Sequence, residues 1–257
     1  MHKRNAVVIG GAQGIGYATC QLLAKDCETL TIIDLNKEAV EGAAKTLAGG
    51  NAKTLGLQVD ITKKDEVAAV RERISREFGT PSILINSAAI VDDKLFLDST
   101  PADWNRMIGV CLYGPMNALH EFLPGMTTAG YGRVVCMASD SYKLGQARLS
   151  YYAAAKGGVV ALVKSLAQEL GRSGVNLNVI SPGATNTEMR NERERTLLAQ
   201  MGPEKYQRRQ NAVLKMYPTG RLGEPKDIAA AVHFLTTEGA AWITGQVLSV
   251  NGGFTMA

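Results

Sequence analysis

Apolar residues occur along the chain in short runs rich in β-branched side chains, which alternate with longer stretches that have helical spacing. The short runs predict seven strands, over residues 6–10, 29–34, 54–59, 82–86, 133–138, 175–180 and 246–250. The longer stretches predict helices over 15–25, 37–48, 63–78, 102–124, 152–170 and 225–237. Strands that are apolar almost throughout are typical of sheets covered on both faces. The pattern therefore predicts a single α/β domain, residues 1–257, with a seven-stranded, mainly parallel sheet and helices on both faces.

Residues 184–217 interrupt this alternation with helical patches and no strand signal. Such a long connection in a compact domain is usually functional, so the segment is predicted to be a substrate lid. Seven basic against four acidic residues give it a net charge of +3, most of the +4 of the whole chain. The basic residues are Arg190, Arg193, Arg195, Lys205, Arg208, Arg209 and Lys215. Two interpretations stay open, an anionic substrate held by these side chains or a solvated amphipathic helix.

Composition narrows the class of protein. With 257 residues, 46% of them hydrophobic, the chain can bury one sizeable core. The basic residues form no long run, so nucleic acid is not the expected partner. Four cysteines and three histidines show no metal-ligand spacing, which favours reduced thiols, no metal site and a cytoplasmic location. No apolar stretch approaches the roughly 18 residues of a membrane helix, so no membrane partner is expected.

The first predicted strand leads through GGAQGIG, residues 10–16, directly into a helix. Glycines allow a tight turn and a close approach of the backbone to a ligand, and a helix N-terminus favours a pyrophosphate. A glycine cluster in this context indicates a dinucleotide site, with an ordinary tight turn as the alternative.

Asp34 ends the second predicted strand, where a carboxylate would accept hydrogen bonds from the ribose hydroxyls of the cofactor. Leu35 follows it, and Gln13 stands at the loop position where a basic residue could meet a 2′-phosphate. This pattern favours NAD over NADP. The alternative for Asp34 is a helix N-cap.

Tyr152 and Lys156 lie four residues apart, so they share one helix face. A nearby ammonium and a positively charged nicotinamide both favour the phenolate. Together they are expected to lower the tyrosine pKa from its usual value near 10, as a general base at neutral pH requires. Neighbouring Tyr151 has Ala155 at the equivalent spacing. For an isolated pair of this kind, the alternative is a solvated surface contact.

These residues belong to a longer series of motifs. The series includes GGAQGIG, LQVDIT, NSAA at 86–89, YAAAK at 152–156, SPGATNT at 181–187, GRLGEP at 220–225 and ITGQVLSVNGG at 243–253. Because it contains these motifs in this order, the chain resembles the short-chain dehydrogenase/reductases over essentially its full length. The resemblance implies a Rossmann fold, a nicotinamide cofactor and a homotetramer. Within that family, MASD, YAAAKGGVVA and GQVLSVNGG are similar to segments of alicyclic hydroxyacyl-CoA dehydrogenases and 3-oxoacyl reductases.

The resemblance also implies roles for individual residues. Tyr152 corresponds to the general acid/base, Lys156 to its partner and Ser139 to the residue that hydrogen-bonds the substrate oxygen. The expected cofactor-binding residues are Gly10, Gln13, Gly14, Ile15, Gly16, Asp34, Leu35, Asp60, Ile61, Asn86, Ala88, Tyr152, Lys156, Pro182, Gly183, Thr185 and Thr187.

Three departures from the family pattern stand out. Gly10 takes the place of a threonine, and Ser87 and Ala89 replace an asparagine and a glycine. Cys111 aligns with the asparagine that completes the family's catalytic tetrad and holds a proton-relay water. A thiol is a weak donor and acceptor, so this relay is in doubt and a buried, apolar cysteine is the favoured interpretation.

The leading prediction is an oxidoreductase that transfers a hydride between NAD and a secondary alcohol or ketone. Its candidate substrate is an anionic or acyl-CoA-linked cyclic hydroxy compound. A sugar, a polyol or another small secondary alcohol is the alternative. Two other classes stay open: a catalytically weak NAD-sensing protein, suggested by Cys111, and a nucleic-acid binder, suggested by the pI of about 8.8.

Overall fold

The computed structural model describes residues 3–256 and contains a seven-stranded sheet in which every neighbouring pair is parallel. The strands are β1 (Asn5–Ile9), β2 (Thr29–Asp34), β3 (Lys53–Gln58), β4 (Ile83–Asn86), β5 (Gly132–Met137), β6 (Val175–Pro182) and β7 (Val247–Val250). Their order is β3-β2-β1-β4-β5-β6-β7. The direction of winding therefore reverses between β1 and β4, which is where doubly wound sheets form a crevice at their carboxyl ends.

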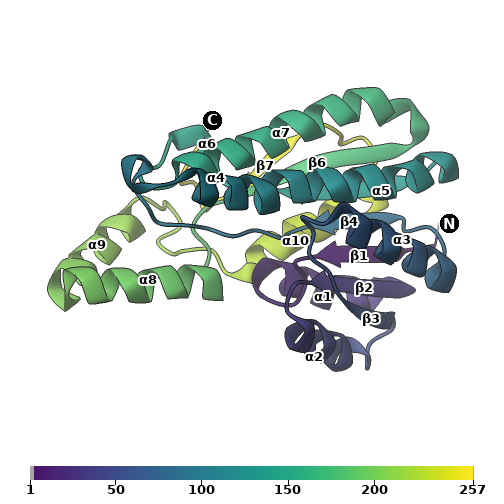
Figure 1. Cartoon of the computed structure of the whole chain (residues 1–257), viewed down its shortest axis with the longest axis horizontal. Helices are drawn as coiled ribbons and strands as arrows, with labels where there is room; N and C mark the ends of the chain where they lie inside the picture. The colour runs from purple at the N-terminus through teal and green to yellow at the C-terminus, as the bar shows by residue number, and fades with distance from the viewer. Residues whose placement is uncertain (1–2, 257) are drawn as a thin grey trace.

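Helices cover both faces of the sheet. They are α1 (Gly14–Asp26), α2 (Lys37–Leu47), α3 (Lys64–Phe78), α4 (Pro101–Ile108), α5 (Gly114–Ala129), α6 (Ser141–Leu144), α7 (Ser150–Leu170), α8 (Glu188–Met201), α9 (Pro203–Lys215) and α10 (Pro225–Leu235). Helices α3, α5 and α7 lie on one side, and α1, α2 and α10 lie on the other (Figure 1).

Alternate side chains of each central strand supply these two cores. In β1, Val7 packs in the cluster that contains Phe122 of α5, whereas Val8 packs in the cluster that contains Leu23 of α1. Successive side chains of a strand point to opposite faces, so a strand buried on both sides must be apolar at every position. The continuous apolar runs in the sequence have this cause.

The predicted helix over 102–124 is wrong in its continuity and its end. The structure has α4, a π-helical turn over Gly109–Tyr113, and then α5, which continues to Ala129. Pro115 cannot donate to the carbonyl of Cys111 four residues earlier, and its ring would clash with that group. The N–H of Gly114 instead bonds the carbonyl of Gly109, five residues back. The short helix α6 was not predicted.

Residues 184–217 contain α8 and α9, which extend beyond the ends of the strands on one side of the molecule (Figure 1). The segment forms no strand of the sheet, and Thr185 makes only an isolated bridge with Gly223. This arrangement agrees with the helical patches read from the sequence. Among residues 3–256, no helix combines the length and apolar character needed to cross a bilayer.

Candidate active site

A cavity of about 660 Å³ lies at the carboxyl ends of the central strands, between the sheet and the α8–α9 segment. All the residues predicted from the sequence line it, except Gly16 and Asn86. Gly16 lies behind the glycine turn, where an added Cβ would be 1.9 Å from the carbonyl oxygen of Gly10. Asn86 is buried at the end of β4. One cavity therefore brings together segments that are far apart in the sequence.

The turn between β1 and α1 requires glycine at its closest contacts. Gly10 has a φ of 73°, and a Cβ there would be 2.5 Å from the backbone nitrogen of Ala88. Helix α1 begins at Gly14, no side chain caps its N-terminus, and Gly14 and Ile15 form part of the cavity wall. The positive end of the helix dipole thus lies at the cavity, as a pyrophosphate site requires.

Asp34 lies at the carboxyl end of β2 with its carboxylate fixed by backbone donors. Its Oδ2 accepts a hydrogen bond from the Ala12 N–H at 3.1 Å, and its Oδ1 accepts one from the Asn36 N–H at 3.4 Å. The N-cap of α2 is Asn36, whose side chain accepts from the Ala39 N–H at 3.0 Å. The N-cap interpretation of Asp34 is therefore wrong.

Asn86 carries an unsatisfied amide at the edge of the site. Both its Nδ2 and its Oδ1 are buried, and neither has a hydrogen-bond partner among residues 3–256. Leaving a buried polar group unpaired costs about 1–3 kcal/mol. Asn86 does not line the cavity itself. Ser87 and Ala88, which follow it, line the cavity. With the glycine turn and Asp34, this arrangement fits a dinucleotide cofactor.

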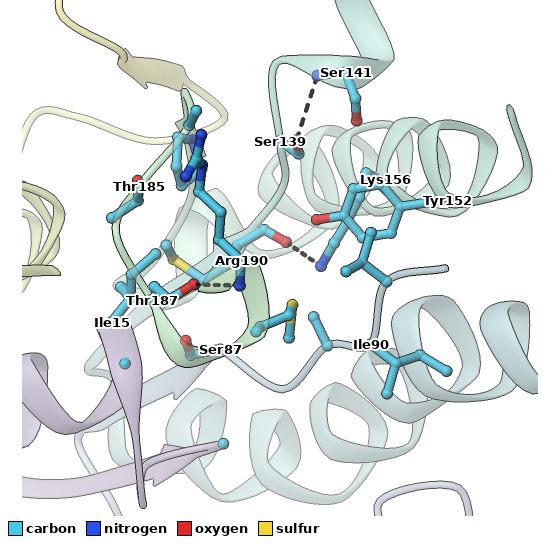
Figure 2. A pocket seen from close by; sticks show the side chains of 18 of the residues that line it. Ile15, Ser87, Ile90, Ser139, Ser141, Tyr152, Lys156, Thr185, Thr187 and Arg190 are labelled. Carbon is cyan, nitrogen blue, oxygen red and sulfur yellow. Dashed lines mark hydrogen bonds between the residues drawn. The ribbon is translucent and has the colours of Figure 1, made fainter. Parts of the chain in front are cut away.

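Tyr152 and Lys156 lie in the first turns of α7, and both line the cavity. Lys156 is only 2% exposed, and its Nζ donates to the Met137 carbonyl at 2.9 Å. That Nζ lies 5.7 Å from the centre of the Tyr152 ring. Figure 2 shows both side chains below Ser139, across the cavity from Thr185 and Thr187. The alternative of a solvated surface pair is therefore wrong.

Burial dominates the acidity of Tyr152. It raises the pKa of this phenol above its usual value near 10, and the nearby Cys111 thiol adds to the increase. The Lys156 ammonium and the Ser139 hydroxyl act in the opposite direction, because both favour the phenolate. The expected influence of Lys156 on the pKa of Tyr152 has the right sign, and in the protein without its cofactor burial outweighs it. Without further positive charge in the cavity, the phenol is protonated at neutral pH.

Tyr151 differs from its neighbour in environment. Its hydroxyl donates to Asp92 Oδ2 at 2.8 Å, and the residue is not part of the cavity wall. Burial and this carboxylate raise the pKa of Tyr151 to about 12. Of the two adjacent tyrosines, Tyr152 is the one placed for chemistry in the cavity.

Cys111 is fully buried in the π-helical turn. Its Sγ donates to the Ile90 carbonyl at 3.5 Å and lies 3.7 Å from Met107 Sδ. Tyr151 and Ala155 complete its apolar surroundings. The structure thus confirms the interpretation of Cys111 as a buried, apolar side chain.

The structure adds wall residues that the sequence did not single out. The apolar ones include Ile90, Val91, Leu149, Met189, Val213, Met216, Tyr217 and Phe254. Tyr217 and Phe254 stack with their ring centres 4.9 Å apart. No local signal marks Phe254, because its position depends on how the C-terminus folds back over the site. Among residues 3–256, no group of histidine, cysteine and acidic side chains is arranged to hold a metal.

Comparison with known proteins agrees with this geometry. A family model described as enoyl-(acyl carrier protein) reductase matches residues 10–255. The chain is 34% identical over 254 residues to cis-4-hydroxycyclohexanecarboxylate dehydrogenase of Sinomonas cyclohexanicum, covering 98% of this chain and 97% of that protein. It is also 34% identical over 254 residues, with the same coverage, to a 3-oxoacyl-(acyl-carrier-protein) reductase of Vibrio cholerae. An uncharacterized short-chain type dehydrogenase/reductase of Sinorhizobium fredii is 32% identical over 255 residues, 97% of this chain and 96% of that protein.

Proposed function

Since the chain belongs to the short-chain dehydrogenase/reductase family, a family of oxidoreductases, we propose that it transfers a hydride between NAD and a secondary alcohol or its ketone. The observation that carries this proposal is the joint placement of Ser139, Tyr152 and buried Lys156 in the wall of one cavity that also contains the glycine turn. We further propose that the α8–α9 segment is the lid of the substrate side and that the substrate is anionic.

The glycine turn, Asp34, Ala88 and the segment 182–187 would hold NAD, whose nicotinamide exchanges a hydride with the substrate carbon when it is bound. Ser139 would hydrogen-bond the substrate oxygen and so fix the orientation of the reacting carbon. In ketone reduction, the neutral Tyr152 phenol would donate its proton to that oxygen. In alcohol oxidation, the Tyr152 phenolate would accept the hydroxyl proton, and the Lys156 ammonium would stabilise the negative charge.

The preference for NAD rests on Asp34. Its carboxylate is held at the cavity by two backbone N–H groups and would accept hydrogen bonds from ribose hydroxyls. A 2′-phosphate at the same place would meet a fixed negative charge.

The direct test is Tyr152→Phe. We expect turnover of a responsive secondary alcohol to fall by about 10²-fold or more, because the acid/base group is lost, while the affinity for NAD changes little. Turnover is followed by absorbance of the reduced cofactor, and affinity is measured by calorimetric titration.

The adjacent substitution Tyr151→Phe is the matched control. It removes one hydroxyl, which bonds Asp92 and does not line the cavity, so turnover should stay within a few-fold of the parent protein. An undiminished rate in Tyr152→Phe would sink the proposed mechanism.

One observation favours a second candidate, a protein that binds NAD and catalyses poorly. Cys111 occupies the tetrad position in an apolar setting, where it gives a relay water little support. This candidate requires NAD binding without measurable hydride transfer across a panel of cyclic, acidic and sugar alcohols. Turnover of any one of them that Tyr152→Phe abolishes excludes it.

A further inference from the structure

The α8–α9 segment turns three arginines toward the reaction cavity. Arg190 and Arg193 of α8 and Arg209 of α9 line the same cavity as Ser139 and Tyr152. Their side chains are 15%, 19% and 28% exposed, well below the 64% of Arg195 on the same helix. Figure 2 shows Arg190 across the cavity from Tyr152 and Lys156. These side chains are therefore part of a wall and not a solvated helix face.

Arg190 and Arg209 share one carboxylate. Arg190 Nη2 lies 3.2 Å from Glu194 Oε1, and Arg209 Nη1 donates to Glu194 Oε2 at 2.7 Å. Gln210 Nε2 donates to the same Oε2. Glu194 has only 7% of its side chain exposed and lines the same cavity, where it holds both guanidinium groups in place. The group of Arg190, Glu194 and Arg209, called here the arginine pair site, carries a net charge of +1.

A second carboxylate that pairs with two arginines, that of Asp93, lies on the loop beside α8. Asp93 accepts hydrogen bonds from both Arg148 and Arg193, and these two contacts lower the pKa of Asp93 against the effect of its partial burial. This group also carries one positive charge in excess. It ties α8 to the loop that supplies Ile90 and Val91 to the cavity wall.

Four other acidic residues line the cavity, and two of them, Asp34 and Asp60, make no described ion pair with the arginine pair site. Glu188 lines the wall but pairs with the exposed Arg195. Asp140 accepts hydrogen bonds from Ser181 Oγ at 2.6 Å and from Asn251 Nδ2 at 2.5 Å. Neither carboxylate makes a described ion pair with the arginine pair site. A guanidinium has five N–H donors, and one carboxylate cannot satisfy two of these groups.

We propose that the arginine pair site binds an acidic group, a carboxylate or a phosphate, on the substrate, an inference that rests on the proposed hydride transfer at Tyr152. A planar guanidinium matches two oxygens of such a group, and partial burial strengthens the interaction. The remaining wall, with Ile90, Leu149 and Val213, suits an apolar carbon frame. A sugar or polyol would leave the excess charge unpaired, so this chemistry favours a hydroxy or oxo acid.

The experiment compares three forms of one carbon frame: 3-hydroxycyclohexanecarboxylate, its uncharged methyl ester, and its CoA thioester, whose acidic groups are phosphates. The parent protein should have a kcat/KM at least tenfold higher for a charged form than for the ester. Preference for the acid assigns the site to a carboxylate, and preference for the thioester assigns it to a phosphate. Equal rates for all three forms overturn the inference and leave the hydride-transfer proposal intact.

Arg190→Met and Arg209→Met should each reduce the preference for the charged form over the ester to within about threefold, mainly by raising KM for the charged form. Arg208→Met is the matched control, since that arginine lies on α9, is exposed and does not line the cavity, and it should keep the full preference. Arg209→Lys keeps the positive charge, so it should retain part of the preference for the charged form over the ester. A preference that survives in both Met variants overturns the inference.

A binding measurement separates the two proposals. Cyclohexanecarboxylate and its CoA thioester have no hydroxyl to oxidise, so their affinity for the protein with NAD can be measured by calorimetry without turnover. At least tenfold weaker binding of one of them by the Met variants supports the arginine pair site even if no alcohol is oxidised, an outcome that would contradict only the hydride transfer. Equal affinity in all variants counts against the site.

Discussion

At the residue scale, Tyr152 shows how burial and charge compete. Sequence spacing is enough to predict that Lys156 lies beside the phenol, because residues four apart share a helix face. The spacing does not reveal how deeply the pair is buried, since this depends on the packing of α7 against the rest of the chain. Burial and the Cys111 thiol together raise the pKa of Tyr152 more than Lys156 and Ser139 lower it. The lysine therefore limits an increase in the pKa of the phenol.

This competition predicts the pH dependence of alcohol oxidation. The base is the phenolate, so kcat/KM rises with pH until the pKa of Tyr152 is passed. In Lys156→Met the stabilising ammonium is lost, so the pKa of Tyr152 rises further and the rising limb should move to higher pH. At a fixed pH on that limb, the rate should fall by about tenfold for each pH unit of this move. The measurement is a pH series of initial rates at saturating NAD.

Lys164→Met provides the control for this shift. It removes the same group from the exposed side of the same helix, so its pH profile should match that of the parent protein. A rising limb that stays in place in Lys156→Met would contradict the assigned role of the lysine.

At the element scale, most strands and helices could be predicted because the apolar pattern follows from burial on both faces of the sheet. The π-helical turn at Gly109–Tyr113 could not, because it depends on the chain geometry imposed by Pro115 inside a continuous apolar pattern. Helix α6 has only four residues and no period to detect. Asp60 and Ile61 were placed at the cavity from the family motif, and they do line it.

The segment after β7 depends on a contact that no local pattern marks. Asp140, 2% exposed and adjacent to Ser139, accepts a hydrogen bond from Asn251 Nδ2 at 2.5 Å. The Asn251 side chain also donates to the Thr255 carbonyl at 3.0 Å. These bonds hold Phe254, between the two residues, in the cavity wall. The C-terminal segment is thus fixed to the loop that carries Ser139.

Asn251→Ala should therefore lower the free energy of unfolding by about 1–3 kcal/mol, because the buried Asp140 carboxylate loses a donor. Chemical denaturation followed by fluorescence measures the change. Asn186→Ala is the control, since Asn186 donates to Glu224 at 2.6 Å on the surface, where water replaces the lost bond. Its effect should stay within about 0.5 kcal/mol. Equal losses of unfolding free energy in the two variants would show that the Asn251–Asp140 hydrogen bond contributes no more than a surface hydrogen bond.

At the scale of the whole molecule, the strand order creates the site. The reversal between β1 and β4 brings the carboxyl ends of these strands to one crevice, so the glycine turn and the Ser87–Ala88 segment meet although they are far apart in sequence. The net charge of residues 184–217 could be counted from the sequence. Which arginines of this segment face the cavity, and that Arg195 is exposed, depends on how the segment packs and could not be read from the sequence. The homotetramer and the cytoplasmic location stay predictions.

Because the cofactor would contact many separate segments of this crevice, its binding should stabilise the fold as a unit. A ligand at 100 times its Kd stabilises the native state by about 2.7 kcal/mol. For a chain of this size each kcal/mol raises Tm by about 2–4 °C, so saturating NAD should raise it by about 5–10 °C. NADP at the same concentration should give a clearly smaller shift, because its 2′-phosphate is repelled by the Asp34 carboxylate. Asp34→Asn, which removes the charge and keeps the shape, should narrow the gap between the two cofactors. Equal shifts with NAD and NADP in the parent protein, measured by scanning calorimetry, would contradict the assignment of Asp34 as the residue that selects the cofactor.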